Sequence, residues 1–184
     1  MFDKRVQPLI LAVKSWAAKY GILDSKNGRL NSFSFVMMTI HFLQSVCSPP
    51  VLPNLSKMYP NVFDPFIHVD CITKRHPQCI PWQLKLVEND RSVGELLLGF
   101  IAYYSEFDWK NYAIVIREGR LVRRDVDCEE CACDMYIEEP YDRFNTARTV
   151  KTAHDAEEIV TSIEAVARGI FEIRTIDITD LLQL

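Results

Sequence analysis

The sequence predicts a single α+β domain that is mostly α-helical, with a small β-hairpin beside a polar loop. Apolar residues recur at intervals of three and four over residues 6–20 and 159–173, which is the spacing of one helix face. A β-branched run at residues 112–116 and a short apolar run at 135–137 flank a turn-rich segment, as the two arms of a hairpin do. The 184 residues are 48% hydrophobic and 25% charged, which suits one globular core.

The charge of the chain limits the functions that it supports. The formal net charge is -4 at pH 7, so the surface as a whole is unsuited to binding nucleic acid through clustered lysine and arginine. No apolar run approaches the roughly 20 residues that cross a bilayer, and the N-terminus lacks the pattern of a signal peptide. We therefore expect a cytosolic or nuclear protein with no membrane partner.

The first two elements are predicted to be helices. Residues 6–20 place Leu9, Val13 and Trp16 on one face, and Gly21 ends the run. Lys14 lies at the edge of this apolar stripe, where a lysine that reaches past the core into solvent is the commoner arrangement. Residues 31–34 offer several N-cap side chains for a second helix, which is apolar nearly all round as far as residue 46 and should be central.

The middle of the chain is predicted to be irregular. Residues 51–55 read as an extended, proline-set segment, and residues 56–89 hold four prolines with aromatic residues between them. Connections of this length are usually functional or interaction surfaces. Ser92 and Glu95 have the spacing of a capping box, which opens a third helix over residues 96–104.

The predicted hairpin joins residues 112–116 to residues 135–137 through an acidic, cysteine-rich turn. We expect its cysteines to be free thiols, because Cys128, Cys131 and Cys133 supply only three local zinc ligands. A fourth would have to come from Cys71, Cys79, His68 or His76. Asp125 and Asp127 do not follow an apolar strand, which favours a surface position over a metal site.

The C-terminal part is predicted to be an amphipathic helix of about five turns. Thr152 and Asp155 have capping-box spacing, and isoleucine or valine recurs every three or four residues from 159 to 173. Residues 177–182 are predicted to form one further short turn.

The segment 137–148 carries the densest group of polar side chains at a structural boundary. It reads Ile-Glu-Glu-Pro-Tyr-Asp-Arg-Phe-Asn-Thr-Ala-Arg, and we call it the acidic motif. By itself it indicates a solvated turn.

Six blocks of the chain change this interpretation. They are Arg5-Val6-x-Pro8-Leu9-Ile10-x-x-Val13-Lys14-x-Trp16-Ala17, Asn31-Ser32-Phe33-Ser34, His41-Phe42-Leu43-Gln44, Val51-Leu52-Pro53-Asn54-Leu55, Gly94-x-Leu96-Leu97-x-Gly99-Phe100-x-x-Tyr103-Tyr104 and Ile137-Glu138-Glu139-Pro140-Tyr141-Asp142. Together and in this order they resemble the C-terminal half of the noncanonical poly(A) polymerases, template-independent RNA nucleotidyltransferases, and most closely those of the cytoplasmic, germline type.

The resemblance implies that residues 1–184 form the helical central domain, incomplete at its N-terminus. A polymerase-β-like catalytic domain, absent from this chain, would carry the carboxylates that hold Mg²⁺ or Mn²⁺ for transfer of AMP from ATP. The chain alone would then be inactive, with no catalytic or metal-binding residue of its own.

The resemblance also implies a set of nucleotide-binding residues. Lys14 would reach the triphosphate, Ser32 would bind a phosphate, and Phe33, where the family commonly has tyrosine, would stack on the base. Glu139, Asp142 and Asn145 would face the base edge. Uridylyltransferases of the family carry a histidine just before the matching asparagine, and its absence here favours ATP over UTP.

Two alternatives remain: a non-catalytic interaction or nucleotide-binding module, and a fragment of a uridylyltransferase of the same family. The resemblance implies cytoplasmic polyadenylation of mRNA. The expected partners are the catalytic domain, the RNA 3′ end, and an RNA-binding protein that recruits the transcript, because the acidic chain has little surface for RNA.

Overall fold

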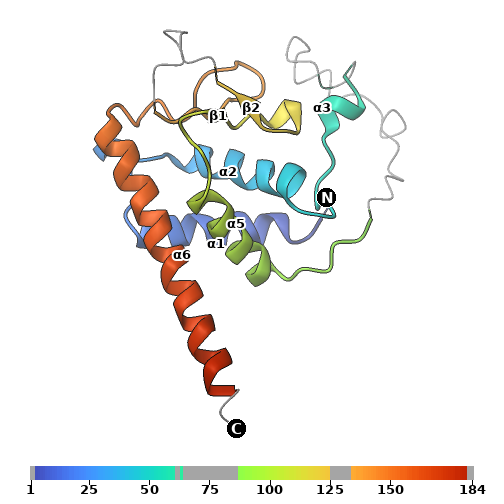
Figure 1. The fold of residues 1–184 in the computed structure, drawn as a ribbon. Helices are drawn as coiled ribbons and strands as arrows, with labels where there is room; N and C mark the ends of the chain where they lie inside the picture. Colours follow the sequence, from blue (N-terminus) through green and yellow to red (C-terminus); the bar gives the residue numbers. More distant parts are fainter. Residues whose placement is uncertain (1–2, 61–62, 64–86, 125–133, 182–184) are drawn as a thin grey trace.

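Four helices build the body of the structure, a computed structural model that describes residues 3–60, 63, 87–124 and 134–181 (Figure 1). They are α1 (Val6–Lys19), α2 (Ser32–His41), α5 (Val93–Ser105) and α6 (Ala153–Leu181). Helix α1 packs against α2 and α5, and α5 packs against α6. Short elements connect them: η1 (Ser25–Asn27), η2 (Phe42–Val46), α3 (Leu55–Met58) and η4 (Ile116–Glu118). The prediction of a mostly helical α+β fold is confirmed.

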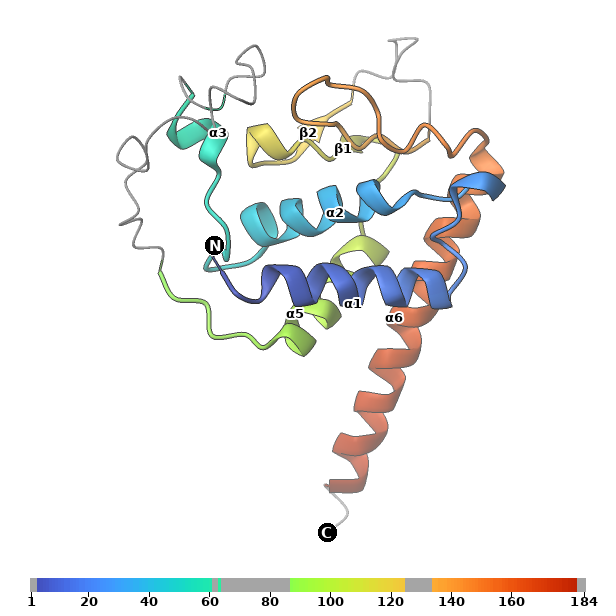
Figure 2. The same ribbon diagram turned by 180° about the vertical axis from the view of Figure 1, so that it is seen from behind.

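Helices α1 and α2 lie side by side and run in opposite directions, as the views in Figures 1 and 2 show. The predicted face of α1 is buried, with Leu9 and Val13 fully covered. Lys14 is half-buried at the edge of this face. Asn31 is the N-cap of α2, since its Oδ1 accepts a hydrogen bond from the Ser34 backbone N–H at 2.8 Å.

Helix α2 is central, as its apolar sequence predicted. It continues into η2 as one turn of π-helix, in which the Cys47 N–H donates to the Phe42 carbonyl at 3.0 Å. Gly99 of α5 lies against this turn, because a Cβ at that position would stand 3.1 Å from Phe42 Cζ. The predicted capping box of α5 is present, with Ser92 and Glu95 exchanging hydrogen bonds.

A buried histidine lies where α2 meets α5. Tyr104 Oη donates to the Met38 carbonyl at 2.9 Å, so it accepts from His41 Nδ1, 3.0 Å away. This fixes the proton on Nδ1 and leaves Nε2 as an acceptor with no hydrogen-bond partner among the described residues. Burial therefore lowers the pKa of His41 from 6.5 to about 4.

His41 should make the free energy of unfolding depend on pH. The unfolded chain binds a proton below about pH 6.5, whereas folded His41 takes one up only near its pKa of about 4. Stability is therefore lost as pH falls through this window, by about 2 kcal/mol between pH 7 and pH 5. Urea denaturation across this range should show the loss in the wild type and a smaller loss in His41→Gln. The control is His154→Gln, which removes a histidine whose side chain is 78% exposed. If His41→Gln lost as much stability between pH 7 and pH 5 as the wild type, the assignment to His41 would be wrong.

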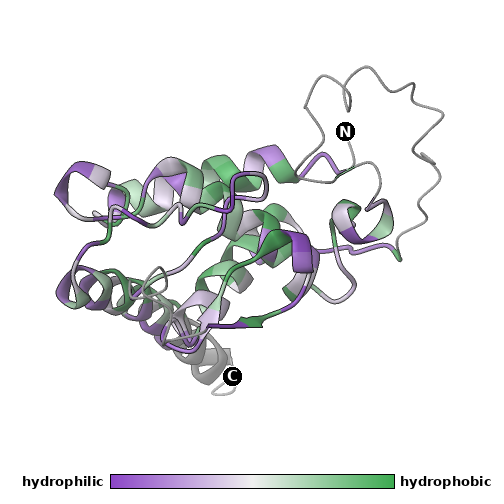
Figure 3. Ribbon diagram, turned by 90° about the horizontal axis from the view of Figure 1, so that it is seen from above, coloured by the Kyte–Doolittle hydropathy of each residue, from purple (hydrophilic) through white to green (hydrophobic). Residues whose placement is uncertain are grey.

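The C-terminal helix is longer than the sequence indicated. The capping box that was predicted at its start is present, because Asp155 N–H donates to Thr152 Oγ1 at 3.1 Å and Thr152 Oγ1 donates to Asp155 Oδ2 at 2.7 Å. Ile159 and Ile163 are fully buried. The helix runs unbroken to Leu181 instead of ending near residue 173, and it extends well past the other helices (Figure 1). Apolar and hydrophilic segments alternate along the helices in Figure 3, as expected for helices that bury one face.

The predicted hairpin partner was wrong. Strand β1 (Tyr112–Ala113) pairs antiparallel with β2 (Val122–Arg123), and a 3₁₀ turn at η4 replaces the end of the expected strand. Residues 135–137 instead make one parallel bridge, between Ile137 and Ile114. The turn at Gly119, which has a φ of 54°, brings β2 back before the cysteine-rich segment begins.

Several predictions fall outside the described residues. These are the free thiols or zinc ligands among residues 68–79 and 128–133, the aspartates at 125 and 127, and most of the irregular connection. The described start of that connection is helical, because it lies in α3. Within the described part of the chain, no helix is long and apolar enough to cross a membrane.

Candidate functional site

The acidic motif folds into a tight turn closed by backbone hydrogen bonds. Glu139 N–H donates to the Phe144 carbonyl at 2.9 Å, and Arg143 N–H donates to the Glu139 carbonyl at 3.0 Å. Arg143 has a φ of 62°, which gives the turn its left-handed residue. The tip of the turn is exposed, with Phe144 67% accessible.

An ion pair anchors the first arm of this turn to the rest of the fold. The Glu138 carboxylate accepts from Arg117 Nε at 2.7 Å, and Glu138 is only 8% exposed. The carboxylate raises the pKa of the Arg117 guanidinium through this hydrogen bond. Because Arg117 belongs to η4, the irregular end of the predicted strand is what positions the motif.

Asn145 fastens the second arm to the first. Its Oδ1 accepts from the Ile137 N–H at 3.0 Å and from the Ala147 N–H at 2.9 Å, and its Nδ2 donates to the Met135 carbonyl at 2.9 Å. All three of these residues are fully buried. The amide thus replaces the ladder hydrogen bonds that a longer strand would supply.

Thr146 joins the motif to the start of α2. Asn31 Nδ2 donates to the Thr146 carbonyl at 2.7 Å, and Ser34 Oγ donates to Thr146 Oγ1 at 3.0 Å. Thr146 Oγ1 in turn donates to the Ile137 carbonyl at 3.0 Å. This three-residue clamp of Asn31, Ser34 and Thr146 brings segments more than 100 residues apart into one site.

Ser32 and Phe33 are therefore held beside the acidic motif, and both are exposed. Phe33 is 44% accessible, so it is not part of the hydrophobic core. Ser32 is not the N-cap either, because Asn31 fills that position. Neither residue has a structural task in the described part of the chain, which leaves a hydroxyl and an aromatic face available to a ligand.

Glu139 and Asp142 lie on the same turn, but their carboxylates differ in their hydrogen bonding. Glu139 Oε2 accepts from the Tyr141 N–H at 2.7 Å and the Asp142 N–H at 2.5 Å, so this carboxylate shapes the turn. The Asp142 side chain is exposed and forms no hydrogen bond or ion pair within the described residues. Asp142 is the freer of the two acceptors.

Lys14 lies on α1, the helix that packs against α2. Its side chain is half-buried and pairs with no carboxylate in the ranges that the structure describes. A lysine without an acidic partner in the described residues, on a helix packed against the one that carries an exposed serine and aromatic ring, is suited to an anionic ligand that carries a planar group.

Sequence reasoning missed Arg117 and Thr146, which position the site without facing it. Thr146 is 3% exposed although it stands in a polar run, and a buried threonine needs a partner. The Asn-Thr pair that ends the motif was the available signal for that partner. Arg117 gave no signal, since it lies just after the predicted strand at residues 112–116.

Comparison with known proteins identifies sequence relatives of this chain. The family model described as Cid1 family poly A polymerase matches residues 92–145. Poly(A) RNA polymerase GLD2 of Mus musculus is 40% identical over 150 residues, covering 80% of this chain and 30% of that protein. The protein of the same name from Homo sapiens is 39% identical over 149 residues, with the same coverage. The chain thus spans about a third of the length of these relatives.

Solved structures of similar proteins share the fold. A cytoplasmic RNA terminal U-transferase superposes with a TM-score of 0.72 at 26% identity, covering 91% of this chain and 53% of that one. GLD-2 in a complex with RNP-8 gives a TM-score of 0.68 at 36% identity, covering 91% and 49%. The Cid1 poly(U) polymerase with Mg and 3′-dATP bound gives 0.70 at 26% identity, covering 91% and 52%.

Proposed function

Because the chain belongs to the Cid1 family of terminal nucleotidyltransferases and matches the PAP-associated domain of its GLD2-type poly(A) polymerases, we propose that it forms the ATP-binding wall of an RNA 3′-end adenylyltransferase. Residues 1–184 supply the central domain, and a polymerase-β-like domain joined to them supplies the chemistry. We call this combination the complete enzyme.

One observation carries the proposal: the clamp of Asn31, Ser34 and Thr146 holds an exposed Phe33 beside the acidic motif. We propose that a base stacks on Phe33 and that its polar edge meets the turn that presents Asp142. Exposed aromatic rings bind nucleobases through their faces, and a carboxylate accepts hydrogen bonds from an exocyclic amine.

We assign the remaining residues by the chemistry of their side chains and, for Glu139 and Asn145, by their contacts. Lys14 and Ser32 bind the triphosphate, the first as a charge and the second through its hydroxyl. Glu139 and Asn145 act first on the turn itself, because their side chains already hold its backbone. They set the position of Asp142 and the shape of the protein surface that faces the base edge.

Metal-dependent transfer belongs to the complete enzyme. No three His, Cys, Asp or Glu side chains gather to hold an ion within residues 3–60, 63, 87–124 and 134–181, so we derive no catalytic step from this chain. Two divalent ions in the catalytic domain would activate the 3′-hydroxyl and stabilise the leaving pyrophosphate. The chain alone is proposed to be inactive.

The acidic net charge of -4 suggests that RNA is recruited by another protein. The similar GLD-2 forms a complex with RNP-8, and we propose that an RNA-binding partner likewise brings mRNA to the complete enzyme. One of the similar structures is a cytoplasmic transferase, and we propose the cytoplasm as the site of action here.

Primer extension tests the proposed function. The complete enzyme should lengthen a single-stranded oligo(A) primer with ATP and Mg²⁺, while residues 1–184 alone should not. A complete enzyme that extends the primer only with UTP would establish the uridylyltransferase alternative. One that folds but adds no nucleotide would leave only the non-catalytic alternative.

A histidine inserted between Phe144 and Asn145 should shift the complete enzyme from ATP toward UTP. The insertion restores the imidazole that uridylyltransferases of the family place before this asparagine, and it fills space that a purine needs. We expect the ratio of ATP to UTP incorporation to fall about tenfold or more. An alanine inserted at the same place is the matched control for the longer turn. An equal ratio in the two insertion variants would remove the base-reading role of this turn.

A further inference from the structure

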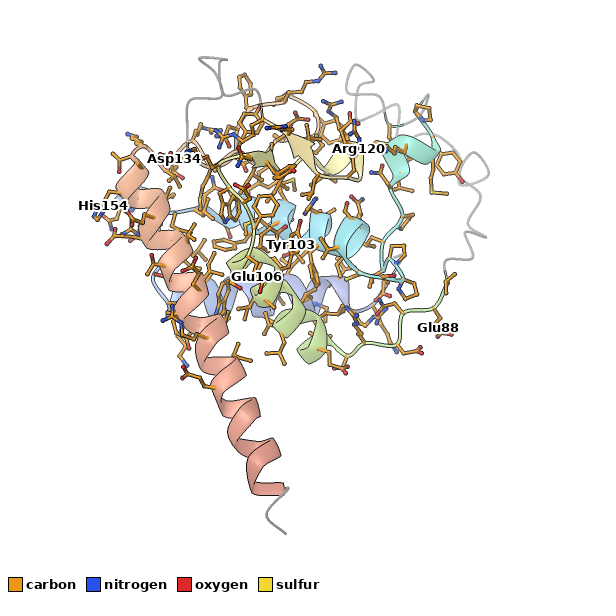
Figure 4. The ribbon with its side chains drawn as sticks, viewed as in Figure 1. Glu88, Tyr103, Glu106, Arg120, Asp134 and His154 are labelled. Carbon is orange, nitrogen blue, oxygen red and sulfur yellow. The ribbon has the colours of Figure 1, made fainter. Side chains whose placement is uncertain are left out.

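A basic hollow lies where η1, the end of the acidic motif and the start of α6 meet. Its volume is about 570 Å³, within the range of roughly 300–1,000 Å³ for small-ligand sites. Figure 4 marks this end of the molecule by His154, at the start of α6. Apart from Gly28, the lining residues have polar or charged side chains: Ser25, Lys26, Asn27, Arg148, Thr149, Lys151, Thr152 and Asp155.

Three cations in this basic hollow form no ion pair within the described residues, although the hydrogen bond from Asn27 and the charge of Lys26 both help to lower the pKa of the neighbouring Asp24. Lys26, Arg148 and Lys151 are exposed and form no ion pair with any described residue. Unpaired positive charges concentrated in one concavity raise the local concentration of anions. The chain as a whole has a net charge of -4, so this group of positive charges differs from the average of its surface.

The one carboxylate among the described lining residues is already neutralised. Asp155 Oδ1 accepts from Arg29 Nη1 at 3.2 Å, and Oδ2 accepts from Thr152 Oγ1 at 2.7 Å. The hydrogen bond from Thr152 and the charge of Arg29 lower the pKa of Asp155. It therefore stays ionised and paired, and the three cations remain in excess.

The wall of the hollow is fixed by specific contacts. Gly28 has a φ of 75°, and a Cβ there would stand 2.7 Å from Asp155 Oδ1, so only glycine lets η1 approach α6 this closely. Thr149 Oγ1 donates to the Arg29 carbonyl at 2.8 Å, which joins the segment after the acidic motif to the turn that contains Gly28. The cations thus project from a defined frame.

The segments that line the hollow adjoin, along the sequence, those that carry the proposed nucleotide site. Arg148 lies two residues after Thr146 of the clamp, and Lys26 lies five residues before Asn31, which is at the other side of that clamp. The same short segments that present Phe33 and Asp142 therefore present these cations.

We propose that the basic hollow binds backbone phosphates of the single-stranded RNA whose 3′ end the complete enzyme extends. The proposal rests on the proposed function. It adds a local RNA contact to a chain whose average surface repels RNA. A divalent cation is repelled by the three positive charges, and a strand that carries a charge at every nucleotide is what they attract. The contact keeps the strand in place between successive additions.

The test is the complete enzyme with Lys26→Gln, Arg148→Gln and Lys151→Gln combined. At moderate salt its Kd for a fluorescent oligo(A) strand, measured by anisotropy, should rise about tenfold. The slope of log affinity against log salt should decrease in magnitude by about 2, as expected for three lost phosphate contacts to a single strand. The KM for the primer should rise with the Kd, while kcat and the KM for ATP stay unchanged.

A matched control carries Lys4→Gln, Lys57→Gln and Lys110→Gln, three exposed lysines away from the hollow. Equal Kd values and salt slopes in the two triple variants would overturn the proposal. A rise in the KM for ATP without a change in RNA binding would assign the hollow to the triphosphate and overturn it as well. Because anisotropy needs no catalysis, a failure of the proposed adenylyltransferase activity is visible separately, as absent extension by the wild type.

Discussion

Replacing Asn145 with alanine is expected to lower kcat/KM for ATP in the complete enzyme by about 100-fold and to destabilise the chain by about 3 kcal/mol. The substitution leaves the N–H groups of Ile137 and Ala147 and the carbonyl of Met135 without the partners that the amide supplies. Each of these residues is fully buried, so water cannot replace the lost hydrogen bonds without opening the turn. Urea denaturation and steady-state kinetics measure the two effects.

Asp142→Asn is the matched comparison, because it separates a residue that holds the turn from one that faces the ligand. The Asp142 side chain makes no contact of its own in the described structure, so its change should raise the KM for ATP without changing the free energy of unfolding. If Asn145→Ala raised the KM but left stability intact, Asn145 would be a direct base contact and its positioning role would be wrong.

The helices could be predicted because their signals are local. Capping boxes at Ser92 and Thr152 and the apolar stripe that includes Leu9 were each readable within a few turns of chain, and each is present. The length of α6 was missed because the isoleucine spacing weakens after residue 173, where the expected helix ended. An α-helix continues past its packed region without needing that spacing.

The hairpin and the site could not be predicted in this way, because distant segments decide both. Whether β1 pairs with residues 122–123 or with residues 135–137 depends on where the chain turns, and the Gly119 turn comes first. The exposed state of Phe33 follows from the use of Asn31 as N-cap and from the contact with Thr146, 115 residues away from Asn31. The resemblance named the candidate residues, but only the structure shows which of them are free and which hold the turn.

Replacing Phe33 with alanine should raise the KM for ATP of the complete enzyme about 10- to 100-fold, the loss expected when a base no longer stacks on an aromatic ring. The side chain is 44% exposed, so its removal leaves no sealed cavity and the stability of the chain should change little. This combination distinguishes a ligand-binding phenylalanine from a core one.

The conservative variant makes the test of Phe33 sharper. Phe33→Tyr restores the hydroxyl that the family commonly has here and keeps the ring, so the KM for ATP should equal or fall below that of the wild type. Phe144→Ala, at a residue that is 67% exposed on the neighbouring turn, is the control for general loss of aromatic surface and should raise the KM less. Should Phe144→Ala raise the KM more than Phe33→Ala does, the stacking platform would belong to the turn, and the start of α2 would act only as its support.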